Sequence, residues 1–367
     1  MTNRGNSRLI RRVALVVLGV ACLFGVSAPV AAGDEATPTW RLKSYRTRGW
    51  DRSFKCDLAQ EFGVAPRVVV YGGSRGMRMD PSTIRNRTGL PAFNFAFHNG
   101  HPEDAWAVTD WLLDTYPDEP PAVVWCIQAT TLADIPMAPG LILDERLSQA
   151  FPAALIDAEM PTAKKAPLRN LLSGRKYRRD GLLLQNAYDR RRAQGRTLKR
   201  ALDIYLQPKM LAKAGNRKLP GNTRAKQYFV RTIKLLNSKG IKPLIVIMPY
   251  HPRALKAFRA VGWGVKERWL RTYLKGLQKK GCTFRIVNCV NIKTFGGNPA
   301  GFYDGSHLTV ENSRRLLKYC MTKAPGCFRV PPPPPSDPPT PEEPPAVTAP
   351  QYTPVPEVSD TPGDLLE

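Results

Sequence analysis

The chain alternates between short apolar runs and longer amphipathic stretches. Parallel βαβ units require this alternation of strands and helices. Five runs of five or six residues are predicted to be buried strands: Arg67–Tyr71, Ala92–Phe97, Ala122–Ile127, Leu244–Met248 and Thr283–Asn288. The pattern therefore predicts an α/β fold with a mainly parallel sheet.

Three of the intervening stretches carry helix signals. Pro102 is followed by two acids, which suits the first turn of a helix. A second helix is predicted from Asn222 to Asn237, just before a Lys-Gly stop signal. The last is predicted from about Val310 to Thr322, with Thr309 as its N-cap.

The stretch from Ala129 to Gly240 is much longer than one helix between two strands. Its middle contains the basic segments KKAPLRNLLSGRKYRRD and DRRRAQGRTLKR, with leucines at helical spacing. These segments predict a basic helical insertion at about residues 145–225. One interpretation is a lid or a substrate platform. The other is a solvated structural excursion without a ligand.

The two ends of the chain differ from the part between them. Residues 1–32 combine a basic start, an apolar run of 14 residues and small residues at Val30 and Ala32, the pattern of a secretory signal peptide. An uncleaved anchor is the alternative, although a spanning helix needs roughly 20 residues. Residues 331–367 hold 14 of the 35 prolines, seven acids and no base, which predicts a disordered acidic tail. We therefore expect a secreted or extracytoplasmic, envelope-associated protein whose folded part is residues 33–330.

The folded part is strongly basic. The chain has 55 Lys and Arg against 30 Asp and Glu; four of the arginines lie in residues 1–32 and seven of the acids in the tail, so residues 33–330 keep 51 bases and 23 acids, a net charge of +28. Such a surface favours anionic partners. Export argues against nucleic acid and favours anionic envelope polymers, the cell wall or a membrane surface. A solvated basic face without a specific ligand is the alternative.

Six cysteines remain once Cys22 is removed with the predicted signal peptide. An even number in an exported chain favours disulfides, with 15 possible connectivities. Cys320 and Cys327 form the easiest local pair. The alternative is that one or more are buried free thiols, Cys126 first among them.

The segment GGSRG follows the first predicted strand. It lacks the Lys-Ser/Thr of a phosphate-binding loop, and G-x-G-x-x-G does not fit it. Gly72-x-Ser74-x-Gly76 instead matches a nucleophile elbow, in which small neighbours let a serine stand on a sharp turn. A purely structural glycine turn is the alternative.

A matching acid and base lie near the other end of the folded part. In FYDGSHLT, Asp304 and His307 are three residues apart. A serine nucleophile needs a base, and the imidazole needs an acceptor that orients it. One short Asp-x-x-His loop supplies both, so Ser74, His307 and Asp304 are the candidate catalytic residues.

The segments VVVYGGSRGMRMDP, FNFAFHNGHPEDA and FYDGSHLT, in this order, resemble the SGNH (GDSL-type) hydrolase superfamily. They are most similar to its cell-envelope branch, with polysaccharide O-acetyltransferase-like and lipoteichoic-acid D-alanylation-like proteins. The resemblance covers about residues 66–127 and 242–322. It implies a flavodoxin-like three-layer α/β/α sandwich in which Ser74 is the nucleophile, Asp304 and His307 complete the triad, and no cofactor or metal takes part.

The resemblance also implies oxyanion donors. The backbone N–H of Ser74 is one, and Asn99 or Gly100 is the second. The family places an asparagine after the third strand, where this chain has WCIQATT with no asparagine, so Gln128 is a candidate substitute. This departure weakens the expectation of full hydrolytic power and suits a transferase or a degenerate enzyme.

Other polar residues near these segments are candidates for further roles. Arg75 is a candidate for binding an anionic substrate group or for a structural salt bridge. His251 is a candidate cleft residue. The spacing of the following four residues fits no structural zinc pattern, so we expect no metal there: His98, His101, Glu103 and Asp104.

Together these features predict an exported serine esterase or O-acyltransferase. The expected substrate is an acyl ester, acetyl-like in size, on a cell-envelope glycan or anionic polymer. Water or a sugar hydroxyl is the acceptor, and the sequence does not separate the two. A non-catalytic envelope-binding protein with the same fold, anchored by its basic surface, is the alternative.

Overall fold

The computed structural model describes residues 46–47, 51–133, 135–170, 175–216 and 219–330. The predicted signal peptide and acidic tail lie outside these residues. Five parallel strands form the central sheet: β2 (Val68–Gly72), β3 (Ala92–Asn94), β4 (Ala122–Ile127), β8 (Leu244–Ile247) and β9 (Arg285–Asn288). Their spatial order is β3-β2-β4-β8-β9, the order of flavodoxin-like sheets.

All five predicted strands are confirmed, and their ends differ from the prediction by at most three residues. The largest difference is the early end of β3. There the side-chain oxygen of Asn94 accepts a hydrogen bond from the backbone N–H of Ala96 at 2.9 Å. This local bond turns the chain at the strand end, which an apolar run does not reveal.

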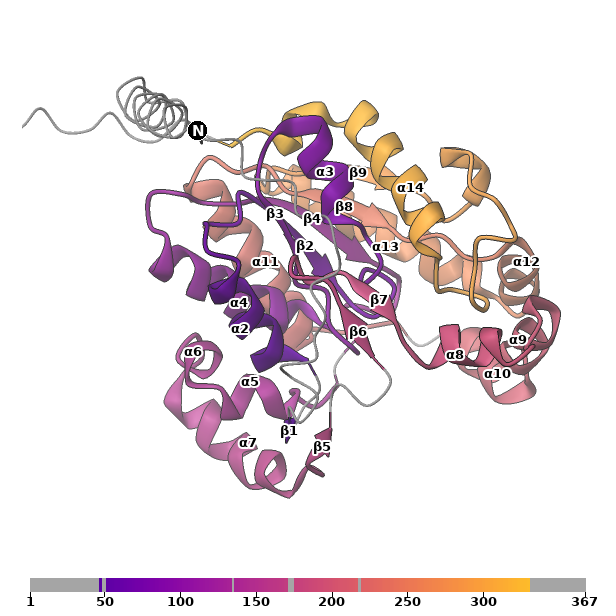
Figure 1. The fold of residues 1–367 in the computed structure, drawn as a ribbon, viewed down its shortest axis with the longest axis horizontal. Coiled ribbons are helices and arrows are strands. Elements are labelled where there is room, and N and C mark those ends of the chain that lie inside the picture. Colours follow the sequence, from indigo (N-terminus) through magenta and orange to yellow (C-terminus); the bar gives the residue numbers. More distant parts are fainter. Residues whose placement is uncertain (1–45, 48–50, 134, 171–174, 217–218, 331–367) are drawn as a thin grey trace, which may run out of the picture. The chain divides into compact units, whose positions relative to one another are not determined.

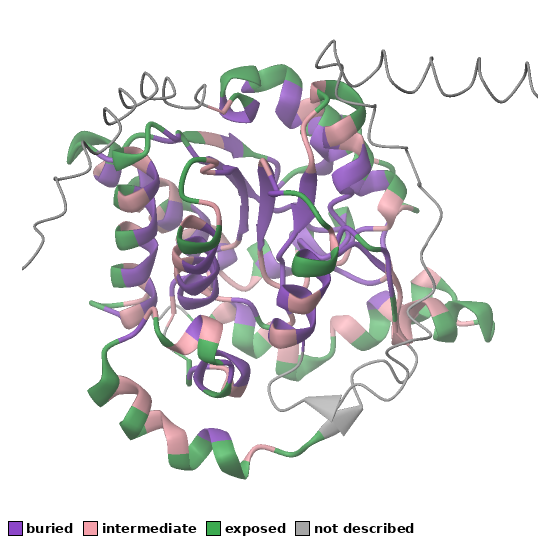
Figure 2. Ribbon diagram, turned by 60° about the vertical axis from the view of Figure 1, so that its left-hand side comes forward, coloured by how far each residue is buried: buried purple, intermediate pink, exposed green. Residues whose placement is uncertain are grey.

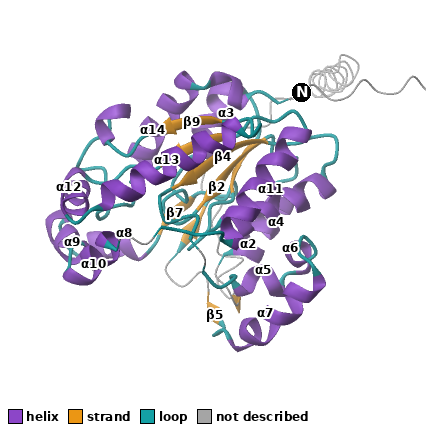
Figure 3. Cartoon of the chain, turned by 180° about the vertical axis from the view of Figure 1, so that it is seen from behind, coloured by secondary structure: helices purple, strands orange, loops and turns teal. Residues whose placement is uncertain are grey.

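Helices cover both faces of the sheet, as Figures 1 and 3 show. One face carries α2 (Arg52–Glu61), α4 (Pro102–Thr115), α11 (Arg224–Ser238) and α13 (Trp263–Lys279). The other carries α3 (Pro81–Thr88), α14 (Val310–Lys323) and the 3-10 helix η3 (Pro325–Phe328). Helix α12 (Pro252–Ala260) and the 3-10 helix η2 (Ile292–Phe295) lie beside these elements. We call the central sheet with all of these helices the framework. The fold is the predicted three-layer α/β/α sandwich, and its three predicted helices are α4, α11 and α14.

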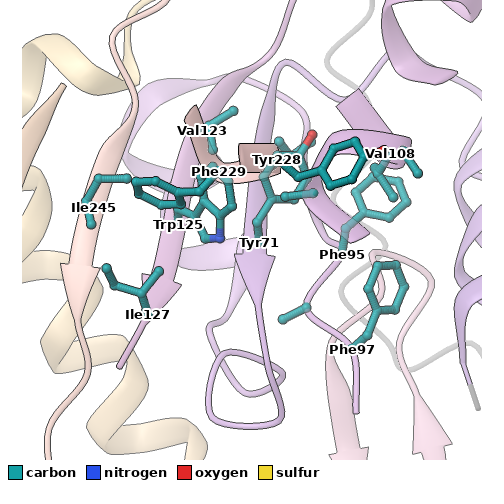
Figure 4. Close-up of a cluster of buried hydrophobic side chains, with 14 of the residues drawn as sticks. Tyr71, Phe95, Phe97, Val108, Val123, Trp125, Ile127, Tyr228, Phe229 and Ile245 are labelled. Atoms are coloured by element: carbon teal, nitrogen blue, oxygen red, sulfur yellow. The ribbon is translucent and has the colours of Figure 1, made fainter. Parts of the chain in front are cut away.

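The strands are apolar along their whole length because both faces are covered. Alternate residues of β2 belong to two separate cores: Val69 packs with α4 and α11, and Val70 packs with α3 and α14. Figure 4 shows the first core, where the rings of Trp125 and Phe229 lie 4.6 Å apart. Each such buried large side chain stabilises the fold by about 1.5–3 kcal/mol. The sheet is therefore a rigid support for whatever follows its carboxyl edge.

The basic insertion (residues 145–225) is helical, as predicted, but it also contains short strands. Between β4 and α11 the chain forms α5 (Pro139–Leu143), α6 (Glu145–Ser148), α7 (Ala153–Lys165), β5 (Arg169–Asn170), β6 (Lys176–Tyr177), β7 (Leu183–Gln185), α8 (Ala187–Ala193), α9 (Leu198–Tyr205) and α10 (Pro208–Gly215). Strand β5 pairs with β1 (Arg46–Thr47), and β6 pairs with β7. Figure 2 shows the buried sheet strands and the exposed outer sides of the surrounding helices.

The hairpin β6–β7 docks on the framework through backbone and charged groups. The N–H of Asn94 donates to the carbonyl of Asp180 at 2.9 Å, and the N–H of Leu183 donates to that of Met77 at 3.1 Å. Arg178 pairs with Asp80 at 2.5 Å and with Asp180 at 2.6 Å, all three buried. These long-range contacts hold together a hairpin whose sequence has no strong strand signal.

The expected disulfides are not formed in the structure. The six cysteines among the described residues are all buried free thiols, and this includes the pair Cys320 and Cys327. Both pack in the core beside α14 as apolar side chains. The even number of cysteines and the predicted export favoured disulfides, but in the structure these cysteines pack in the core as free thiols.

Within the described ranges, no helix is both long and apolar enough to span a membrane.

Candidate active site

Ser74 lies on the turn directly after β2, at the carboxyl edge of the sheet. The turn starts at Gly72, whose φ of 141° is strained for any residue with a side chain. It is closed by a hydrogen bond of 2.8 Å from the N–H of Gly76 to the carbonyl of Gly73. Strand β2 lies between β3 and β4, where the strand order reverses. This switch point is where doubly wound α/β folds bind ligands.

The structure brings Ser74, His307 and Asp304 into one hydrogen-bonded line. The Oγ of Ser74 lies 2.9 Å from the Nε2 of His307, 233 residues further along the chain. The Nδ1 of His307 lies 2.8 Å from the Oδ2 of Asp304. The other carboxylate oxygen accepts hydrogen bonds from the backbone N–H groups of Ser306 at 2.7 Å and of His307 at 2.9 Å. The loop therefore holds the carboxylate, and the carboxylate holds the imidazole.

The charge of Asp304 defines the tautomer of this imidazole. Burial alone would raise the pKa of Asp304, but the charge of His307 and three hydrogen bonds outweigh it and lower the pKa to about 2. Asp304 is therefore ionised at neutral pH, and because a carboxylate can only accept, the Nδ1 of His307 must carry the hydrogen of their contact. With the proton on Nδ1, the Nε2 of His307 is free to accept the hydroxyl proton of Ser74.

Two tyrosines of the insertion contact the loop that carries Asp304 and His307, which we call the catalytic loop. The sequence did not predict a role for either tyrosine. The ring of Tyr188 on α8 lies 5.1 Å from that of His307 and 6.3 Å from that of Tyr303. Burial, followed by the nearby charge of Asp304, raises the pKa of Tyr188 to about 12. Tyr205 of α9 packs on Gly305, where a Cβ would collide with its ring. In the sequence, Tyr188 and Tyr205 are distinguished only as the sole aromatic residues between positions 178 and 216.

The buried side chain of Arg52 holds the loop after β3 in place. Arg52 donates to the carbonyl of His98 at 2.9 Å and pairs with Asp104 at 2.7 Å. Asn99 lies in this loop with a backbone φ of 49°, a conformation that asparagine tolerates better than most residues. Gly100 packs so closely on the end of β2 that a Cβ would collide with the carbonyl of Gly72.

The predicted oxyanion donors are not equivalent in the structure. The N–H of Ser74 makes no hydrogen bond to any described residue, so it is available to a substrate. The N–H of Gly100 instead donates to the carbonyl of Phe97 at 3.1 Å. Asn99 is exposed and lines the cavity beside Ser74. Ser74 and Asn99 therefore remain candidates, whereas Gly100 already has an acceptor within its own loop.

Gln128 follows β4 and is oriented by Arg75. The Nη1 of Arg75 donates to the Oε1 of Gln128 at 2.6 Å. Arginine has donors only, so the amide oxygen must face it and the Nε2 group must face away. Gln128 also lines the cavity beside Ser74. The side-chain amide is thus a candidate oxyanion donor that the family pattern places on an asparagine.

Arg75 itself is built into the protein. It is 6 % exposed, and it donates to the carbonyls of Ser306, at 3.2 Å, and of Pro249. Its guanidinium lies over the ring of Tyr250, 4.1 Å from the centroid. These contacts join the Ser74 turn to the catalytic loop. They favour a positioning role over the predicted contact with substrate, although Arg75 also borders the cavity.

A cavity of about 380 Å³ opens beside the nucleophile. Its lining includes Ser74 and the predicted residues Asn99, Gly100 and Gln128, together with Lys213 of the insertion. Cys126 also lines it, but burial raises the pKa of this thiol to about 12 and keeps it protonated. Ser74, whose hydroxyl contacts the imidazole of His307, is therefore the candidate nucleophile of this cavity.

No protein-family model matches the chain, and no curated protein matches it. The resemblance to SGNH hydrolases consequently stands on the three sequence segments and remains an expectation.

Two of the other histidines, His251 and His98, have structural partners. His251 is buried and accepts a hydrogen bond from the N–H of Arg253 at 3.1 Å, which caps α12. Burial, and then the charge of Arg253, lowers its pKa. His98 contacts a carboxylate oxygen of Asp51 at 3.0 Å. His251 is thus placed as a helix cap and does not line the cavity beside Ser74.

Two of the four residues considered for a metal, Asp104 and Glu103, are paired with arginines. Asp104 pairs with Arg52, and Glu103 pairs with Arg224 at 3.1 Å. In the part of the chain that the structure describes, no group of three or more His, Cys, Asp or Glu side chains is placed to hold a metal ion.

Proposed function

We propose that the protein is an exported serine esterase or O-acyltransferase that acts on ester-linked acyl groups of a cell-envelope glycan or anionic polymer. The observation that carries the proposal is the 2.9 Å contact between the Oγ of Ser74 and the Nε2 of His307, whose other nitrogen contacts a buried carboxylate. Nucleophile, base and orienting acid in this geometry are the requirements for acyl transfer through a serine.

In the proposed first step, the Oγ of Ser74 attacks the acyl carbonyl and His307 takes the hydroxyl proton. The charge that develops on the carbonyl oxygen is stabilised by the N–H of Ser74 and the amide of Gln128. One such donor contributes about 10²–10³-fold to the rate. His307 then gives its proton to the departing alcohol, which leaves an acyl-serine. Asp304 stabilises the imidazolium throughout.

In the second step, an acceptor hydroxyl replaces the alcohol. His307 removes its proton, the acceptor oxygen attacks the acyl-serine, and the proton returns to Ser74. Water as acceptor makes the protein an esterase, and a sugar hydroxyl makes it an O-acyltransferase. Both use the same residues, so the two are separated by comparing acetate released into water with acetyl transferred to added glycans.

A fluorophosphonate probe tests the nucleophile directly, because it labels only activated serines. We expect the wild-type protein to be labelled and Ser74→Ala not to be. Ser238→Ala is the matched control, since Ser238 is exposed at the end of α11. A wild-type protein that is folded by circular dichroism but takes no label would contradict the proposal.

A further inference from the structure

A second cavity, of about 340 Å³, borders the loop of Asp304 and His307 at Tyr303 and Asp304. Helices α8, α9 and α10 form most of its wall, and Figure 1 shows the three together at one side of the sheet. Tyr188, Tyr303 and Asp304 form the wall toward the triad. No motif in the sequence indicated this cavity, because its residues come from two distant segments.

Three arginines line this space, which we call the arginine cavity: Arg191, Arg192 and Arg196. The only acid in its lining is Asp304, which is occupied by His307 and two backbone N–H groups. Among the described residues, no carboxylate pairs with any of the three guanidinium groups. Arg192 makes one long contact, 3.5 Å, with the carbonyl of Ala300. Unpaired guanidinium groups around a hollow attract carboxylate and phosphate groups, which they bind through paired hydrogen bonds.

The two cavities meet different members of the candidate triad: Ser74 lines the first, and Asp304 lines the arginine cavity. The backbone of Ser74 and the amide of Gln128, which would receive the carbonyl oxygen, line the first cavity. The arginine cavity is bordered by Asp304 and by Tyr188, whose ring packs on His307. In acyl transfer the alcohol oxygen must lie beside the imidazole that exchanges its proton. The acyl group therefore belongs on the Gln128 side and the alcohol on the arginine side.

We propose that the arginine cavity binds a carboxylate or phosphate group carried by the alcohol portion of the ester, or by the alcohol that accepts the acyl group. This inference rests on the proposed acyl-transfer function and adds a location for the charge. The enzyme distinguishes an anionic alcohol from a neutral one, and it does so with residues of the insertion. Charge on the acyl group has no partner in this cavity.

Two matched ester pairs test the location of the charge. 4-Acetoxybenzoate carries its carboxylate on the alcohol portion, and its methyl ester is the neutral partner. 4-Nitrophenyl hemisuccinate carries its carboxylate on the acyl portion, and 4-nitrophenyl acetate is the neutral partner. For each pair the measured quantity is the ratio of kcat/KM for the anionic ester to that for the neutral one.

The variants compared are Arg191→Gln with Arg196→Gln, both in the cavity lining, and Arg190→Gln with Arg200→Gln, which are exposed on α8 and α9 and do not line it. Both double variants lose two positive charges, so a general field effect changes them equally. We expect the cavity variant to lower the 4-acetoxybenzoate ratio about tenfold or more, chiefly through KM, because a hydrogen bond to a charged group has this strength. The control variant should change it less than twofold, and the hemisuccinate ratio should be the same in both.

A binding measurement separates this inference from the proposed chemistry. Ser74→Ala protein is titrated with trigalacturonate, glycerol 3-phosphate and neutral maltotriose by calorimetry, with and without the cavity substitutions. Binding of either anion that the cavity substitutions weaken about tenfold supports the site even if no ester is hydrolysed, and the two anions distinguish a carboxylate from a phosphate ligand. Equal ratios and equal binding in the cavity and control variants would overturn the inference, as would an equal loss in both.

Discussion

The sheet edge that carries Ser74 and the insertion that covers it are built on opposite physical principles. The strands of the framework are buried on both faces, and a buried charge such as that of Arg52 is paired, here with Asp104. Helix α8 of the insertion has no buried residue, and α9 has only Leu202. The framework thus obtains its precision from packing, whereas α8 and α9 of the insertion lie on the surface and contribute charge and two tyrosines.

This difference places the proposed acyl-transfer chemistry in the framework and the proposed selection of substrates in the insertion. The triad and the candidate oxyanion donors come from the ends of β2 and β4, the loop after β3 and the loop before α14, all anchored in the framework. The residues that line the arginine cavity come mainly from the insertion. Changes in the framework should therefore affect every substrate, and changes in the insertion should affect some substrates only.

The largest expected effect is that of Asp304→Asn, which removes the acceptor that holds the His307 tautomer. We expect kcat to fall on the order of 10⁴-fold, a size known from serine hydrolases with the same substitution. Asp203→Asn is the control, because Asp203 is half-exposed and pairs only with Arg253 on the surface. A loss of less than tenfold in Asp304→Asn would mean that another group orients His307.

The same variant has a defined signature in stability against pH. The pKa of Asp304 is lowered on folding from 3.8 to about 2, so the ionised carboxylate stabilises the folded state above pH 3.8. That contribution should be lost as the pH falls from about 4 to about 2. The free-energy difference between wild type and Asp304→Asn, measured by urea unfolding, should therefore shrink as the pH falls below about 4.

A smaller effect is expected from Gln128→Glu, which tests the amide as a donor. A glutamate keeps an oxygen for Arg75 but has no N–H when ionised, so we expect kcat to fall about 10²–10³-fold with little loss of stability. Gln227→Ala, on the exposed side of α11, should leave kcat unchanged. Wild-type turnover in Gln128→Glu would assign the oxyanion to Ser74 and Asn99 instead.

Two identical deletions compare the stability of the two regions. Ile245 of β8 is fully buried, whereas Ile204 of α9 is 41 % exposed. Ile245→Ala should lower the free energy of unfolding by about 2–5 kcal/mol, because it leaves a cavity in a packed core. Ile204→Ala should change it by about 0.5 kcal/mol or less. Equal losses in chemical denaturation would show that the insertion is as tightly packed as the sheet.

The smallest expected effect is at Tyr188, where the insertion contacts the triad. An aromatic contact of this kind contributes about 0.5–1.5 kcal/mol, so Tyr188→Ala should lower kcat about two- to tenfold by loosening His307. Tyr188→Phe keeps the ring and should retain nearly all activity on a neutral ester. If Phe is as damaging as Ala, the hydroxyl beside Asp304 is the important group.

Much of the framework could be predicted because its signals are local. Each apolar run lies at a sheet strand, and Thr309 caps α14 as expected. The candidate triad could be proposed because one serine stands in a glycine turn and the acid and base share one short loop. The insertion could not be predicted in detail: the hairpin of Tyr177 and Leu183 depends on contacts with Met77 and Asn94, about 100 residues earlier.

The sequence by itself determined the order of strands and helices and the residues able to act as nucleophile, base and acid, since these follow from periodicity and side-chain chemistry. Only the tertiary structure decided which donors are free. Gly100 is already bonded within its loop, Arg75 is occupied by carbonyls and the amide of Gln128, and the cysteines pack without pairing. Hydrogen-bond acceptors and neighbours come from distant segments, and one-dimensional spacing does not record which segments meet.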